Sequence, residues 1–207
     1  MFNLLSRITF AICLLSASSA FAIESVSPVA VSASERTELD GGEILVTGEP
    51  GAINRGQVMG VVDAPIEPLM RIITDTDNQY LWFPDMLESA VISRDGNQGR
   101  SSGRTNMPWP IADRNYQVDG RYTTYTFSGQ ECHAVEYQYV PGSGNMEDLF
   151  GYYLLCPWEG STTRTVVKYV INADIGVWLP AGIISWAQQR LLPGVITGLR
   201  ERYDVVY

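Results

Sequence analysis

The sequence contains few of the residues from which metal centres and catalytic sets are built. It has one histidine, His133, one lysine, Lys168, and three cysteines, Cys13, Cys132 and Cys156. These residues do not have the ligand spacing of a metal site, and no Gly-x-Ser-x-Gly motif marks a serine nucleophile. No glycine-rich loop opens a helix as a phosphate cradle does. We therefore expect no catalytic residues, no metal and no cofactor, with His133 at the surface or satisfied by its neighbours.

Long hydrophobic runs are also missing, apart from a short one at the start of the chain. Residues 1–22 read MFNLLSRITFAICLLSASSAFA, with Arg7 as the only charge and a small-x-small cleavage form at Ala20-Phe21-Ala22. This pattern is typical of a secretory signal peptide, and its apolar stretch is too short to span a bilayer. We expect cleavage after Ala22 and a soluble, exported, periplasmic protein.

Positive charge is scarce. The 14 Lys and Arg residues stand against 23 Asp and Glu, a net charge of −9, which becomes −10 when Arg7 leaves with the leader. Such a chain has no electrostatic reason to bind nucleic acid or an anionic membrane face. The roughly 185 remaining residues suit one domain with a sizeable core. We expect a flexible mature N-terminus over 23–40, a single domain over 41–207, and a monomer.

The two cysteines outside the leader flank a predicted hairpin. Residues 133–155 read as two strands around a Pro-Gly-Ser-Gly turn, and Gly144 in that turn is midway between Cys132 and Cys156. A hairpin centred there places the two cysteines opposite each other, within bridging distance. An oxidising compartment permits the disulfide, and two free or buried thiols are the alternative.

Most of the remaining chain has the pattern of strands. Residues 43–48 and 57–62 read as a hairpin, 66–75 as a helix, and 89–94, 100–109, 115–127 and 163–174 as further strands. Pro108 and Pro110 exclude their segment from a central strand. With the Cys132–Cys156 hairpin, the order predicts an α+β fold with one antiparallel sheet of seven to eight strands, near the number at which a twisted sheet curls strongly.

The last segment, 179–207, is the one long helical pattern. Ile184, Ala187, Leu191, Val195 and Leu199 recur at three- and four-residue steps, which places them on one helix face. Pro193-Gly194 predicts a kink or short break in the middle. We expect the sheet to curl around this helix, which either covers the core only or also closes a cavity.

Four stretches resemble the START-like, or helix-grip, superfamily (SRPBCC), whose members include steroidogenic lipid-transfer domains, coenzyme Q-binding proteins and polyketide cyclases. They are VVDAPIEPLMRIIT (61–74) with YLWFP (80–84), MPWPIADRNY (107–116), YVPGSGNM (139–146) and LPAGIISWAQQRLLPGVITGLRERY (179–203). The second is the most specific, because it is close to the PWPlsdRd signature of START domains. The likeness covers residue 43 to the end, and it is nearer the compact bacterial type.

The resemblance implies an apolar tunnel between the curved sheet and the C-terminal helix, with access through movement of that helix and of the loops at 80–86 and 141–147. Large aromatic side chains with polar tips suit the wall of such a tunnel. The candidate ligand-binding residues are Arg114, Tyr116, Tyr80, Trp82, Tyr137, Tyr153, Trp178, Ile183, Trp186 and Leu191.

Arg114 is the candidate polar anchor. Adjacent strand residues point to opposite faces, and Arg114 shares its face with Tyr116 and Val118, which are expected to point inward. A buried arginine needs an acidic partner, and Glu136 or Asp174 on neighbouring strands are candidates. Arg114 then either orients a ligand head group or forms a structural ion pair.

The interpretation favoured by these residues is an exported, non-enzymatic binding or transfer protein for a hydrophobic small molecule such as a lipid, sterol or quinone, with transient membrane contact. The alternative is a cyclase/aromatase-like or hydrolase-like enzyme acting on a polyketide or steroid-like substrate in the same pocket. An enzyme needs a cavity-facing acid, tyrosine or histidine with a strongly perturbed pKa. A third class, a partner-binding module, predicts a filled core with no tunnel.

Overall fold

A computed structural model of the chain describes residues 25–49, 54–178 and 181–207. The predicted leader, 1–22, lies outside these residues. The elements are α1 (Ala33–Asp40), β1 (Leu45–Glu49), β2 (Asn54–Val62), α2 (Ile66–Thr74), the 3-10 helix η1 (Thr76–Leu81), β3 (Met86–Asp95), β4 (Gln98–Thr105), β5 (Arg114–Phe127), β6 (Gln130–Tyr139), β7 (Asp148–Pro157), the 3-10 turn η2 (Trp158–Gly160), β8 (Thr165–Asp174), α3 (Ala181–Trp186), the π-helical turn η3 (Ala187–Leu191) and α4 (Leu192–Val206).

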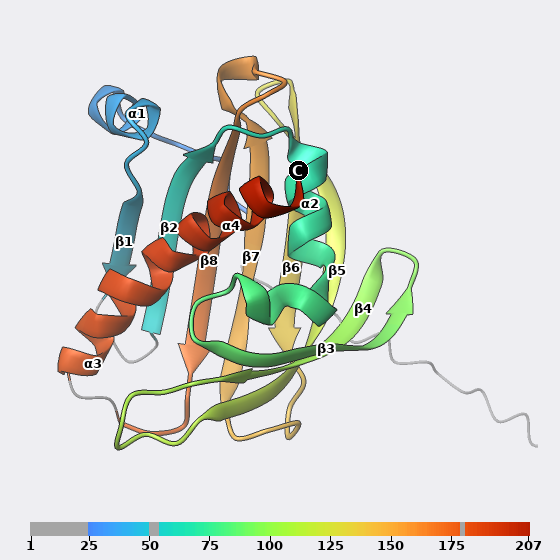
Figure 1. Cartoon of the computed structure of the whole chain (residues 1–207), viewed down its shortest axis with the longest axis vertical. Coiled ribbons are helices and arrows are strands. Elements are labelled where there is room, and N and C mark those ends of the chain that lie inside the picture. Colours follow the sequence, from blue (N-terminus) through green and yellow to red (C-terminus); the bar gives the residue numbers. More distant parts are fainter. Residues whose placement is uncertain (1–24, 50–53, 179–180) are drawn as a thin grey trace, which may run out of the picture.

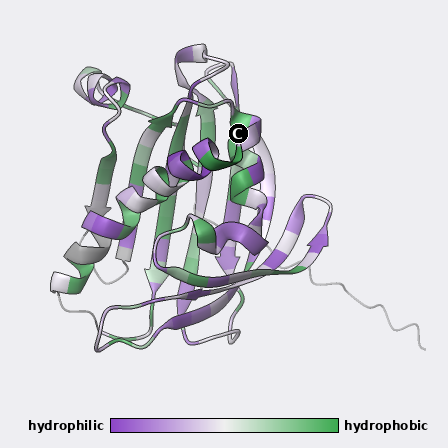
Figure 2. Ribbon diagram, in the orientation of Figure 1, coloured by the Kyte–Doolittle hydropathy of each residue, from purple (hydrophilic) through white to green (hydrophobic). Residues whose placement is uncertain are grey.

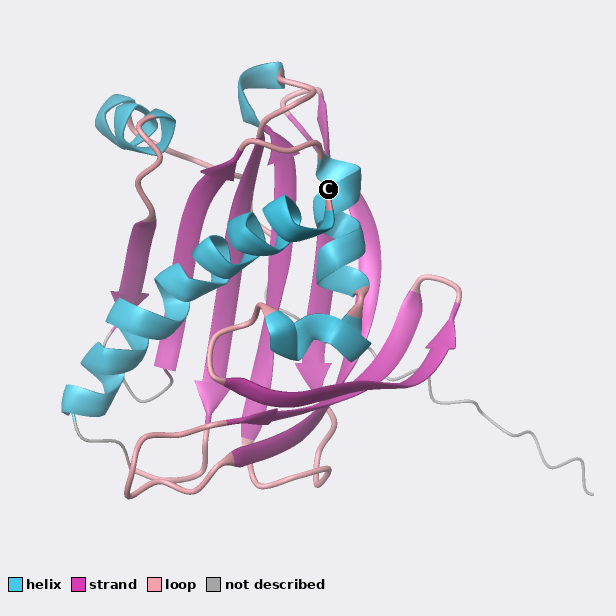
Figure 3. Cartoon of the chain, viewed as in Figure 1, coloured by secondary structure: helices cyan, strands magenta, loops and turns pink. Residues whose placement is uncertain are grey.

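The eight strands form one antiparallel sheet in the order β1-β2-β8-β7-β6-β5-β4-β3. The sheet curves around α4, which crosses its concave face diagonally, while α2 and η1 lie beside α4 (Figures 1 and 3). The predicted α+β helix-grip fold is therefore confirmed. The strand expected at 100–109 ends earlier, at Thr105, because the segment that contains Pro108 and Pro110 forms a loop before β5.

Strand β8 shows why the sheet has two buried faces. Thr165, Val167 and Tyr169 are buried toward the concave face, and Val166 and Val170 are buried on the outer face. Strands covered on both faces are apolar without alternation, which Figure 2 shows as green stretches in the central strands. Two apolar clusters therefore sandwich the middle of the sheet.

The outer cluster is covered by the N-terminal segment, which contains the helix α1 where the sequence suggested a flexible stretch. Lys168 donates to the Ser27 hydroxyl at 2.8 Å, and Ser27 lies 3.1 Å from the Tyr152 hydroxyl. A capping box between Ser32 and Glu35 starts α1, and Leu39 is fully buried. These contacts hold residues 27–40 against the sheet.

The disulfide predicted between the cysteines joins Cys132 and Cys156, whose Cα atoms are 4.4 Å apart. The register of β6 and β7 pairs His133 with Leu155, so the two cysteines are opposite each other, as the hairpin centred on Gly144 requires. Both belong to the outer cluster. The bond therefore ties together the face of the sheet that points away from α4.

The C-terminal helix is interrupted one turn earlier than expected. The irregular turn is η3, at Ala187–Leu191, and Pro193 lies in the first turn of α4. The helix runs on from η3 into α4, since Leu191 has helical backbone angles. Pro193 has no backbone N–H to donate to the carbonyl oxygen of Gln189, which is inside η3, so the proline accounts for an irregular turn just before it. No helix in the described ranges is long and apolar enough to cross a membrane.

Candidate ligand-binding cavity

A cavity of about 850 Å³ lies between the concave face of the sheet and the helices. Its apolar walls come from α2 and the segment after it (Met70, Ile73, Phe83), from the sheet (Leu149, Ile171) and from the C-terminal helices (Ile183, Leu191, Val195). A volume of this size suits a lipid- or drug-sized ligand. The helix therefore does more than cover the core, because it closes one side of an open space.

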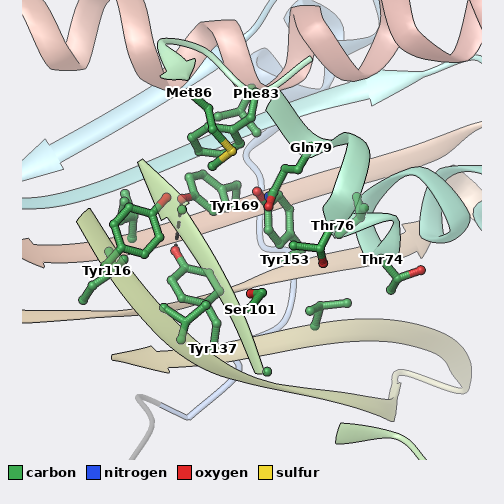
Figure 4. Close-up of a pocket in the computed structure, with 18 of the residues that line it drawn as sticks. Thr74, Thr76, Gln79, Phe83, Met86, Ser101, Tyr116, Tyr137, Tyr153 and Tyr169 are labelled. Atoms are coloured by element: carbon green, nitrogen blue, oxygen red, sulfur yellow. Dashed lines mark hydrogen bonds between the residues drawn. The ribbon is translucent and has the colours of Figure 1, made fainter. Parts of the chain in front are cut away.

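Four tyrosines bring their hydroxyl groups into this apolar space. Tyr137 donates to the Tyr169 hydroxyl at 3.1 Å and lies equally close to the carbonyl oxygen of Val170. The ring of Tyr153 packs against that of Tyr169, with the ring centroids 4.5 Å apart. Figure 4 shows the ring of Tyr116 turned toward Tyr137 and Tyr169. The strands β5, β6, β7 and β8 contribute one tyrosine each to this cluster.

Burial decides the charge of the tyrosine cluster. Desolvation raises the pKa of Tyr137, Tyr153 and Tyr169 well above the ordinary phenol value, and it also raises the pKa of Tyr116. All four phenols are therefore neutral at physiological pH. They can donate and accept hydrogen bonds, but they carry no charge with which to bind an ion.

Two glycines provide the space that the tyrosine rings occupy. A Cβ atom at Gly103, opposite Tyr116 in the β4–β5 register, would lie 2.7 Å from the Tyr116 hydroxyl. A Cβ atom at Gly151 would lie 2.6 Å from the Tyr137 hydroxyl. Both distances are below normal contact, so a side chain at Gly103 would push Tyr116 out of place, and one at Gly151 would displace both Tyr137 and the carbonyl oxygen of Val170, 2.0 Å from the added Cβ.

Arg114 lines the cavity at the start of β5 and is only 6% exposed. The acidic partners expected for it are wrong. Glu136 points to the outer face, where it pairs with Arg121 at 2.8 Å, and Asp174 accepts a hydrogen bond from the backbone of Gly176. The reason is strand parity, because Glu136 alternates with the cavity-facing Val135 and Tyr137.

His133 is held by its neighbours at the rim of the cavity. Its Nδ1 atom lies 2.5 Å from the Tyr122 hydroxyl, and its Nε2 atom lies 3.5 Å from Glu131. This agrees with a satisfied histidine. Among the described residues no group of three or more His, Cys, Asp or Glu side chains is placed to hold a metal ion.

The structure brings six of the ten candidate ligand-binding residues to the cavity. These are Arg114, Tyr116, Tyr137, Tyr153, Ile183 and Leu191. Tyr80 is 44% exposed and Trp178 is 84% exposed, and neither lines the cavity, while Trp82 is buried in the core without lining it. The side chain of Trp186 lies outside the described part of the chain.

Tyr169, Phe83 and Gln79 line the cavity but were not among the predicted residues. Tyr169 could have been predicted, because it is two residues from Val167 and two from Ile171 in β8, and residues at that spacing in a strand share one face. Gln79 carried no such signal, since its position depends on how η1 turns back toward the sheet.

No protein-family model and no curated protein matches the sequence. Similar solved structures include the STAR-related lipid transfer protein of Xanthomonas axonopodis, at 18% identity and a TM-score of 0.64, over 80% of this chain and 94% of that one. Human StAR-related lipid transfer protein 5 matches at 14% identity and a TM-score of 0.64, over 79% of this chain and 83% of that one.

A third similar structure is the Zhui aromatase/cyclase from a Streptomyces species, at 8% identity and a TM-score of 0.55, over 73% of this chain and 94% of that one. Identities this low establish the fold and leave the activity open. Together with the eight-stranded sheet wrapped around α4, these likenesses show that the chain has the START-like, helix-grip fold.

Proposed function

We propose that this protein is an exported carrier that binds one hydrophobic small molecule, of the lipid, sterol or quinone class, in the cavity beneath the C-terminal helix. The observation that carries the proposal is the cavity itself, about 850 Å³ in volume with mainly apolar walls. Burial of apolar ligand surface would drive binding, at about 25 cal/mol per Å² before ordering costs.

The raised pKa values of the tyrosine cluster argue against the enzymatic alternative. A phenol that transfers protons at neutral pH needs a pKa lowered toward 7, whereas burial moves the pKa of Tyr137, Tyr153 and Tyr169 in the other direction. These groups suit hydrogen bonding to a held ligand. The cyclase-like alternative would need a ligand that itself changes this environment.

Two exposed tryptophans support contact with a membrane during ligand exchange. Trp109, in the loop before β5, is 91% exposed, and Trp178, in the segment after β8, is 84% exposed. The antiparallel order places the start of β5 and the end of β8 at the same end of the sheet, at the bottom of Figure 1. Tryptophan favours the interface of a bilayer, and α3 and η3, which help to close the cavity, begin beside this end.

The first experiment is native mass spectrometry of the protein purified from the export compartment of its host, followed by organic extraction. A lipid at near-unit stoichiometry is expected. A ligand-free protein that also takes up no fluorescent lipid would contradict the carrier proposal.

The membrane contact has its own test in vesicle flotation with neutral lipids. The double variant W109S/W178S should float less than the unmodified protein. Y207S is the matched control, because Tyr207 is an exposed aromatic residue at the C-terminus, at the opposite end of the sheet. Equal flotation of all three proteins would contradict this role for the tryptophans.

A further inference from the structure

The cavity contains a buried positive charge, Arg114, that no acidic side chain of the described residues neutralises. Arg114 makes one hydrogen bond, from Nη1 to the carbonyl oxygen of Ala112 at 3.1 Å, and its Nε atom is buried without an acceptor. Within the described ranges no carboxylate pairs with it. The nearby acids are paired elsewhere, since Asp113 lies 3.7 Å from Arg104 and Glu136 pairs with Arg121.

Burial of this charge is costly. An arginine does not lose its proton when buried, unlike a lysine or a histidine. An uncompensated charge away from water is strongly destabilising. A cation kept in this state therefore indicates a missing partner with a negative charge, and the side of Arg114 that faces the cavity is where that partner can reach it.

Two neutral hydroxyl groups flank the same place. Tyr116 lies two residues after Arg114 on the same strand face, and Thr105 is directly opposite Arg114 in the β4–β5 register. The two hydroxyl oxygens are 3.4 Å apart, longer than the 2.5–3.0 Å usual between hydroxyls. Each hydroxyl is thus free to form a better hydrogen bond with a ligand. Gly103 leaves the space in which the Tyr116 ring reaches this position.

We propose that Arg114, Tyr116 and Thr105 form a head-group site for an amphiphile that carries a carboxylate, such as a long-chain acid. This rests on the proposed carrier function and adds the class of ligand. The planar guanidinium pairs with the two oxygens of the carboxylate, and the hydroxyls donate to the same oxygens. The tail extends past the tyrosine cluster along the apolar walls, so the head group lies near the end of the sheet that carries Trp109 and Trp178.

The site is single-charged, and this favours a carboxylate over a phosphate monoester. Five other arginines also line the cavity: Arg55, Arg71, Arg94, Arg100 and Arg121. Arg94 donates to the Thr74 carbonyl oxygen, Arg100 pairs with Asp119 at 2.7 Å, and Arg121 pairs with Glu136 at 2.8 Å. Arg71 lies 4.0 Å from Glu67, with both side chains largely exposed. Arg55 is on β2, four strands away from β5 in the sheet, and none of the five is paired with Arg114 in the β4–β5 register. A second negative charge would therefore have no second cation beside Arg114.

The test compares probes with the same sixteen-carbon chain: hexadecanoic acid, hexadecan-1-ol and monohexadecyl phosphate. Their affinities are measured at pH 7.5 by displacement of a fluorescent lipid. The unmodified protein should bind the acid about 10- to 100-fold more tightly than the alcohol, the range expected for a hydrogen bond to a charged group. R114M should bind both equally, because methionine keeps the apolar volume and removes the charge.

R104M is the matched control. Arg104 is on the adjacent strand, next to the partner position of Arg114, but it pairs with Glu88 and Asp113. This variant should keep the preference for the acid. R114K keeps the positive charge but lacks the planar guanidinium group, so its preference for the acid over the alcohol should be intermediate. It is the second variant to use if R114M does not fold.

A thermal unfolding measurement without ligand separates a binding role from a structural one. R114M should unfold at the same or a higher temperature than the unmodified protein, because it removes an unpaired buried charge, and a clear fall would indicate a structural role instead. Equal affinity of the unmodified protein for the acid and the alcohol would overturn the head-group site while leaving the carrier function intact. Tighter binding of the phosphate than of the acid would overturn the carboxylate assignment. If the fluorescent lipid binds but none of the three probes displaces it, the head-group site is overturned and the carrier function stands, whereas failure of the fluorescent lipid itself to bind would contradict the carrier function.

Discussion

The position of α4 over the sheet depends on a close backbone contact that one substitution tests. A Cβ atom at Gly198 would lie 2.0 Å from the carbonyl oxygen of Trp82, which is backbone and cannot rotate away. Helix α4 would have to move outward by about 1 Å or more to restore normal contact. Leu199 and Ile196 beside it are fully buried, so that movement would loosen their packing as well.

We expect G198A to destabilise the protein. Overpacking of this kind costs about 1–3 kcal/mol, while replacing a helical glycine by alanine returns about 1 kcal/mol. The net loss should reach about 2 kcal/mol, which lowers the unfolding midpoint by about 4–8 °C for a chain of this size. Differential scanning calorimetry measures it directly.

The matched control is G182A, in the same C-terminal segment. Gly182 is exposed in α3, and a Cβ atom there would meet nothing within 4 Å. This variant should gain stability, by up to about 1 kcal/mol. If G198A were stabilised as much as G182A, the close contact between α4 and Trp82 would be refuted, and with it the argument for how the helix is positioned over the cavity.

Three further predictions concern the disulfide, alkaline pH and the lid. Reduction, or the C132S/C156S variant, should lower the free energy of unfolding by about 3.5 kcal/mol in denaturant titrations, with lipid uptake unchanged because both cysteines are on the outer face. Burial and a hydrogen bond to Glu136 raise the pKa of Tyr125 to about 12, so its contribution is complete below pH 10 and is lost as the pH rises toward 12. Y125F should therefore lose less stability between pH 9 and 11 than the unmodified protein. Leu191→Glu should weaken lipid binding without changing the strand signal in circular dichroism, and unchanged affinity would make the helix structural cover only.

The parts of the fold predicted from sequence were those fixed by local pattern. Alternation along β5 placed Arg114 and Tyr116 on one face, and the symmetric spacing around Gly144 paired Cys132 with Cys156, because strand geometry determines both. The same rule also applied to the expected acidic partner of Arg114, because Glu136 is next to Tyr137, which was predicted to face the cavity, and adjacent strand residues point to opposite faces. What the pattern along one strand does not give is the residue opposite Glu136, since its pairing with Arg121 depends on the register between β5 and β6.

The positions of the tryptophans were also not predictable from the sequence pattern. Trp82 and Trp178 were both predicted to bind the ligand, but one is buried in the core and the other is exposed at the end of the sheet. Composition favoured a wall of aromatic residues without saying which ring would reach the cavity. That choice depends on how η1 and the segment after β8 turn, and no periodic pattern in the sequence records it.

The location of the cavity follows from where the sheet has glycine. Gly56 and Gly60 on β2 receive Leu192 and Ile196 of α4, since a Cβ atom at either position would lie 2.6 Å from the helix side chain. The helix is thereby drawn toward the β2 and β8 side of the concave face. The other side, at β4, β5 and β6, lies away from the main contacts of α4 with the sheet, which are with β2 and β1, and becomes the wall that holds Tyr116, Tyr137 and Arg114. Larger residues at Gly56 and Gly60 would push α4 outward and toward that wall, so the same two glycines that seat the helix also keep the ligand space open.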